Sequence, residues 1–251
     1  MRSVARGGRG GRLVARCRGP ALRRDHGRRH RPVRHRSGDP PVAGRQTERS
    51  SPIRNRALQI VLAATLLLGL CIGAIEVALP GLAVREGSRA AAGVLLGLWS
   101  IGSLIGGLVY GARVARTEVT VRYVWLTLLV AATTAPLIFA GFLAAALPLS
   151  LLAGVGLAPL MACQYTLVGE LADRRAVAEA FAWTSAALVS GIAGGNAVGG
   201  VLVQGGGIAG AFALGCVTQV LGALIALIGR HQLSSAVMRR KPQEVAAAMS
   251  S

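Results

Sequence analysis

The sequence predicts an all-α membrane protein with six transmembrane helices. Between Ala57 and Gly229 the chain is almost continuously apolar, and this stretch divides into six segments long enough to cross a bilayer. A spanning helix needs about 20 consecutive, mostly apolar residues. Only one charged side chain, Glu76, lies well inside any segment. Soluble domains of this size do not carry six such segments, so we expect a multi-pass membrane protein and not an enzyme.

Short links separate the predicted spans, so successive helices should be antiparallel neighbours. The six-helix domain covers 57–229. The spans are 57–84, 90–112, 123–141, 144–168, 178–203 and 208–229.

The arginines predict the orientation of these helices. Basic residues concentrate in cytoplasmic loops of membrane proteins. The third and fifth links carry none, whereas both tails are basic, including the C-terminal tail, 230–251. We therefore expect a protein of the cell membrane with both termini in the cytoplasm. The second and fourth links carry Arg113, Arg116, Arg122, Arg174 and Arg175.

The first 56 residues differ in composition from the rest. They hold seventeen arginines, three histidines and three acidic residues, and show no apolar periodicity. Such a segment cannot bury enough surface to offset its ordering entropy, so we predict a disordered basic tail, 1–56. Three interpretations remain open: an arm that touches anionic lipid headgroups, an arginine–glycine segment that binds RNA, or a wrong reading frame or start site in GC-rich DNA.

A weak internal repeat relates the second and fifth spans. The stretch from Trp99 to Gly111 can be laid over the stretch from Trp183 to Gly195, with the tryptophan, one leucine and two glycines coinciding. The six helices would then be a 3+3 repeat. Inverted three-helix repeats are the building unit of many secondary transporters.

Glycines at four-residue spacing dominate the same two spans. Small residues let helix backbones approach closely, and packing in lipid depends on such contact. Two interpretations remain open, namely packing within one bundle and sliding surfaces at a domain interface. The predicted packing positions are Gly102, Gly106, Gly107, Gly111, Gly195 and Gly199.

Glu76 is the leading functional candidate. An acidic side chain within a span is costly and usually faces a partner or a water-filled path. It lies four residues before Pro80, which can bend the helix. Two roles compete: handling of protons or substrate, and a hydrogen-bonded carboxyl group that holds helices together.

Four further polar or aromatic residues lie at membrane depth. Each could line a substrate cavity or serve as an ordinary packing or hydrogen-bonding group. These candidates for the substrate or proton pathway are Trp99, Gln164, Tyr165 and Asn196.

The sequence contains no recognisable catalytic, cofactor or metal motif. Its glycines lie inside apolar spans and not between a strand and a helix, as a phosphate-binding loop requires. The cysteines have no metal-ligand spacing, so neither a metal site nor a disulfide framework is expected. They are Cys17, Cys71, Cys163 and Cys216.

Three stretches resemble the C-terminal half of actinobacterial, export-type transporters of the major facilitator superfamily. The resemblance covers about 52–232. The stretches are Leu68-Gly69 to Glu76 and Pro80, Leu98-Trp99-Ser100 to Tyr110-Gly111, and Glu179-Ala-Phe181-Ala-Trp183 leading into Gly194-Gly195-Asn196.

The resemblance implies one lobe of a two-lobed transporter. The six spans would be helices seven to twelve of the family, and the first, second, fourth and fifth would line a central cavity. The family's gating motif, Gly-x-x-x-Asp-x-x-Gly-Arg, corresponds to Gly107-x-x-x-Gly111-Ala-Arg113 without its acid. Because the N-terminal lobe is absent, the chain would be a truncated form or would pair with another six-helix lobe, including a copy of itself.

The function expected is therefore secondary transport, by proton-coupled efflux of a small molecule, with the lipid bilayer as surroundings. Nucleic acid is not an expected partner of the membrane domain. Two alternatives remain: a membrane remnant that transports nothing, and a membrane-tethered basic arm that binds lipid or nucleic acid.

Overall fold

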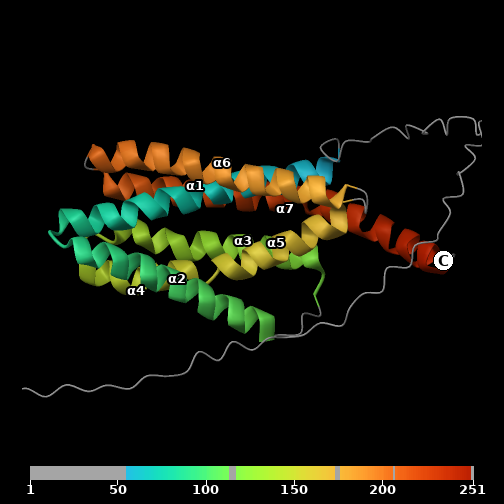
Figure 1. The fold of residues 1–251 in the computed structure, drawn as a ribbon, viewed down its shortest axis with the longest axis horizontal. Helices are drawn as coiled ribbons and strands as arrows, with labels where there is room; N and C mark the ends of the chain where they lie inside the picture. Colours follow the sequence, from blue (N-terminus) through green and yellow to red (C-terminus); the bar gives the residue numbers. More distant parts are fainter. Residues whose placement is uncertain (1–54, 113–116, 173–175, 206, 250–251) are drawn as a thin grey trace, which may run out of the picture. The chain divides into compact units, whose positions relative to one another are not determined.

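A computed structural model describes residues 55–112, 117–172, 176–205 and 207–249, with side chains described as far as Met238. The described residues are helical, without strands. Six helical segments are long and apolar enough to cross a membrane, which confirms the predicted all-α membrane fold (Figure 1). The predicted tail, 1–56, lies outside the described residues except at its end, where Asn55 and Arg56 begin the first helix.

The six spans contain seven α-helices and one short 3₁₀ helix. The third span is α3 with η2, and the fourth is α4 with α5. The elements are α1 (Arg56–Arg85), α2 (Arg89–Ala112), α3 (Val119–Thr134), η2 (Ala135–Phe139), α4 (Leu143–Gly154), α5 (Leu157–Leu171), α6 (Val177–Gln204) and α7 (Ile208–Met249).

The first helix starts and stops at clear local signals. The side chain of Asn55 accepts a hydrogen bond from the Ala57 amide at 3.0 Å, which caps the helix. At the other end Gly87 has a φ of 79° and donates to the Val84 carbonyl. A residue with a Cβ is strained at that φ, so glycine suits this tight link to α2.

The fourth span departs from a continuous helix. It is broken between Gly154 and Leu157. Pro159 has no amide proton, and its ring would clash with the carbonyl of Val155 in an uninterrupted helix. The two glycines beside Val155 make the break easier.

The last helix is longer than the predicted sixth span, 208–229. It continues through Arg230 to Met249, and its membrane-capable part reaches Met238. The apolar pattern ends near Gly229, but a helix satisfies its backbone hydrogen bonds internally and can continue beyond the apolar segment.

The contacts between helices match the predicted 3+3 repeat. Helix α1 packs mainly on α6 and α7, α2 packs on α4 and α5, and α3 packs on α7 (Figure 1). In a 3+3 repeat the first span corresponds to the fourth and the second to the fifth. The contact between α1 and α6, the first and fifth spans, then corresponds to the contact between the fourth span and α2, and both contacts are present. Helices α2 and α6 do not contact each other, so they flank α1 from separate sides.

Candidate functional site

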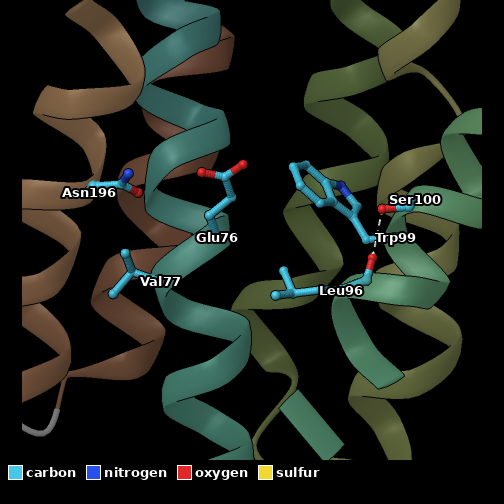
Figure 2. A pocket seen from close by; sticks show the side chains of 6 residues that line it. All are labelled: Glu76, Val77, Leu96, Trp99, Ser100 and Asn196. Atoms are coloured by element: carbon cyan, nitrogen blue, oxygen red, sulfur yellow. Dashed lines mark hydrogen bonds between the residues drawn. The ribbon is translucent and has the colours of Figure 1, made fainter. Parts of the chain in front are cut away.

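A pocket between α1, α2 and α6 brings together three of the predicted site residues, Glu76, Trp99 and Asn196 (Figure 2). The cavity measures about 490 Å³, within the range of about 300–1,000 Å³ typical of small-molecule sites. Its walls are Glu76, Val77, Leu96, Trp99, Ser100 and Asn196.

Glycine contacts between α1 and α6 position two of these side chains. A Cβ placed on Gly73 would collide with the backbone of α6 at the Ile192 carbonyl and the Asn196 amide. A Cβ on Gly195 would collide with the backbone of α1 around Leu70. The two backbones therefore touch within one helical turn of Glu76, and this contact holds Asn196 at the same level.

A second glycine contact positions Trp99. A Cβ on Gly154 of α4 would collide with the Trp99 carbonyl and lie 2.9 Å from the Ser103 amide. Gly102 likewise abuts the Leu151 carbonyl. Helix α2 is thus fixed against α4 at the residue that carries the indole, which is largely buried at 8% exposure and lines the pocket.

Glu76 is half-buried and bears a carboxyl group without a partner. No described residue forms a hydrogen bond or ion pair with it. In Figure 2 its carboxyl group lies between Asn196 and the ring of Trp99. The arginines whose side chains are described lie away from the depth of Glu76. Arg56, Arg85, Arg89 and Arg122 are at or near helix ends, and Arg230 follows Gly229, which packs beside Ile60 in the first turns of α1.

Two more residues that line the pocket carry side-chain oxygens. Asn196 Oδ1 is buried and has no hydrogen-bond partner among the described residues. Ser100 Oγ donates its proton to the Leu96 carbonyl at 2.9 Å, which leaves its lone pairs free to accept. Together with the carboxyl group of Glu76, these atoms give the pocket three acceptor groups.

The other two candidates from the sequence, Gln164 and Tyr165, do not line this pocket. Gln164 is fully buried, and neither atom of its amide has a partner among the described residues. The Tyr165 ring lies 5.8 Å from that of Phe181 on α6. Both residues belong to α5, whereas α1, α2 and α6 form the pocket.

The remaining predicted packing glycines have different surroundings. A Cβ on Gly107 would lie 3.1 Å from the Ala158 Cβ, and one on Gly199 would lie 3.2 Å from the Ala74 Cα. Gly106 abuts the carbonyl of Val155, which lies in the linker between α4 and α5. Nothing lies within 4 Å of a Cβ on Gly111 in the described structure.

A tyrosine and an arginine join the ends of α2 and α3. Arg122 Nη1 donates to the Tyr110 hydroxyl at 2.9 Å, and the guanidinium lies 5.9 Å from the tyrosine ring centroid. The gating motif that the sequence resembles lacks its acid at Gly111. The polar contact described at this end of α2 is the one between Tyr110 and Arg122. Arg113 lies outside the described residues.

Sequence reasoning missed Ser100 as a pocket residue. A serine in an apolar helix commonly bonds back to the carbonyl four residues earlier, as Ser100 does with Leu96, so it gives little functional signal. Its position directly after Trp99 in the internal repeat was the available indication.

Comparison with known proteins identifies the family. No curated protein matches the chain. The family model described as Major Facilitator Superfamily matches residues 61–248, well over half of the chain and all six spans except the first turns of α1. The chain, with its six membrane-capable helices, therefore belongs to the major facilitator superfamily.

Proposed function

We propose that this chain is one lobe of a proton-coupled exporter of a small molecule. Membership of the family supports membrane transport of the facilitator type. The observation that carries the finer proposal is the half-buried carboxyl group of Glu76, which faces a cavity and has no described partner. Acidic groups in such positions mark substrate and proton paths in membrane proteins.

Glu76 would carry the proton. An unpaired carboxylate is costly at membrane depth, and either a proton or a bound partner removes that cost. A proton and the transported molecule would therefore bind at Glu76 in alternation, each displacing the other. Asn196 and Ser100 would orient the molecule, and Trp99 would cover its apolar part.

The lobe would work against a second six-helix lobe, either on another chain or on a second copy of this one. The six spans would correspond to helices seven to twelve of the family, inserted in the cell membrane with both termini cytoplasmic. The exposed apolar faces of α2 and α6, on either side of the pocket, support this arrangement. On α2 and α6 the strongly exposed side chains include Leu104, Leu108, Val189 and Val201.

Transport into inside-out vesicles tests the proposal. Three probes would be offered under an imposed pH gradient: the cation ethidium, its uncharged phenanthridine parent, and the anion fluorescein. We expect uptake of at least one probe that requires the gradient and is abolished by Glu76→Gln. Glu179→Gln is the control, because Glu179 is an exposed acid in the first turn of α6.

Two results would contradict the proposal. Wild-type vesicles that take up none of the probes above the rate of empty vesicles would favour a non-transporting membrane protein. Gradient-driven uptake that is the same in Glu76→Gln and wild type would remove the proton role from Glu76.

A further inference from the structure

We propose that the pocket selects monovalent organic cations that carry N–H groups. The positive charge would pair with Glu76, the N–H groups would donate to Asn196 and Ser100, and an apolar ring would lie against Trp99. This inference rests on the proposed transport function and names the class of molecule that the site accepts.

The charge of the ligand follows from the surroundings of Glu76. Among the described residues, the next basic group along α1 is Arg85, nine residues further on. At a rise of about 1.5 Å per residue this is roughly 13 Å along the helix, too far for an ion pair. An anion would be repelled by the carboxylate and a neutral molecule offers it no charge, so only a cation can take the place of the proton at Glu76.

The hydrogen-bonding groups of the ligand follow from the acceptors around the pocket. Asn196 Oδ1 is buried without a partner, and the proton of Ser100 Oγ is already donated to Leu96. A buried acceptor that stays unpaired is costly. A ligand that donates an N–H group satisfies Asn196 Oδ1, and the exposed Ser100 hydroxyl offers a second acceptor. A ligand with acceptors alone satisfies neither oxygen.

The apolar part of the ligand follows from the rest of the wall. Val77, Leu96 and the indole of Trp99 line the cavity, and the indole faces Glu76 across it (Figure 2). A cation beside tryptophan is attracted by the ring as well as by the carboxylate. The volume of about 490 Å³ suits a molecule of a few fused rings.

Ethidium and its uncharged parent, 3,8-diamino-6-phenylphenanthridine, make a matched pair of probes. Both carry two aromatic amines, and only ethidium has a permanent positive charge. Binding would be measured by equilibrium dialysis on the full-length chain in lipid nanodiscs, after nuclease treatment to remove nucleic acid. We expect ethidium to bind at least about tenfold more tightly than its parent, a preference worth about 1.4 kcal/mol.

Three variants locate the preference. Glu76→Gln should abolish it, Glu76→Asp should keep it, and Trp99→Ala should weaken ethidium binding by roughly tenfold. Glu179→Gln, on the exposed start of α6, should bind both probes like the wild type. Size-exclusion chromatography and circular dichroism would verify that each variant is folded.

Equal binding of the two probes, or a preference that survives Glu76→Gln, would overturn the inference. If Glu179→Gln also lost the preference for ethidium, that preference would come from general surface charge, and the inference would again be overturned. Failure of the transport proposal gives a different pattern: ethidium binds through Glu76, but no probe crosses the vesicle membrane.

Discussion

Replacing Gly73 by alanine tests how the site is held together. The new Cβ would lie 2.8 Å from the Asn196 amide nitrogen and still closer to the Ile192 carbonyl oxygen. Both atoms belong to the backbone of α6, so neither can rotate away, and α1 and α6 must separate. Overpacking of this kind costs about 1–3 kcal/mol.

Gly97→Ala is the matched control, because nothing lies within 4 Å of a Cβ at Gly97 in the described structure. Alanine also stabilises a helix relative to glycine by up to about 1 kcal/mol, and both variants share this gain. The difference between the two variants therefore isolates the contact. We expect Gly73→Ala to unfold at lower denaturant than Gly97→Ala, by about 1–3 kcal/mol in free energy of unfolding.

The assay is reversible unfolding in mixed detergent micelles with increasing dodecyl sulfate, followed by circular dichroism at the helix band. Ethidium binding by the folded variant gives a second readout, because separation of α1 from α6 moves Asn196 away from Glu76. Equal stability of Gly73→Ala and Gly97→Ala would refute the argument that backbone contact fixes the pocket.

Two further predictions concern the links between helices. Gly87→Ala should cost about 1 kcal/mol in free energy of unfolding because of the positive φ, and Gly87→Asn should cost less; the same detergent titration measures both. Single cysteines at Ser88 and Gly141 should react with an impermeant maleimide added outside cells, whereas one at Thr117, an exposed residue in the link before α3, should react only after permeabilisation. The reverse pattern would refute the proposed orientation.

Much of the fold was predictable because hydropathy acts over whole spans. Six apolar segments of about 20 residues leave little choice of class, since a bilayer demands internally hydrogen-bonded helices. The ends were less predictable. The helix ending at Met249 runs past the apolar pattern, and the break before Pro159 falls inside an apolar segment where hydropathy does not change.

The site was predictable in part. Glu76 and Asn196 stand out because polar residues are rare at membrane depth. Which of them share a cavity depends on helix rotation and on contacts between distant segments, such as Gly73 with Gly195. Gln164 stands out equally in the sequence, yet it is fully buried on α5 away from the pocket. Hydropathy alone does not tell which polar residue lines a pocket and which is buried between helices.

Proton movement through Glu76 tests the central claim most directly. Proteoliposomes that contain the full-length chain and an internal pH-sensitive dye would be given the probe that the vesicle experiment shows to be transported. The claim predicts a pH change on probe addition with wild-type protein and with Glu179→Gln, and none with Glu76→Gln. Probe-driven proton movement of wild-type size in Glu76→Gln would contradict it.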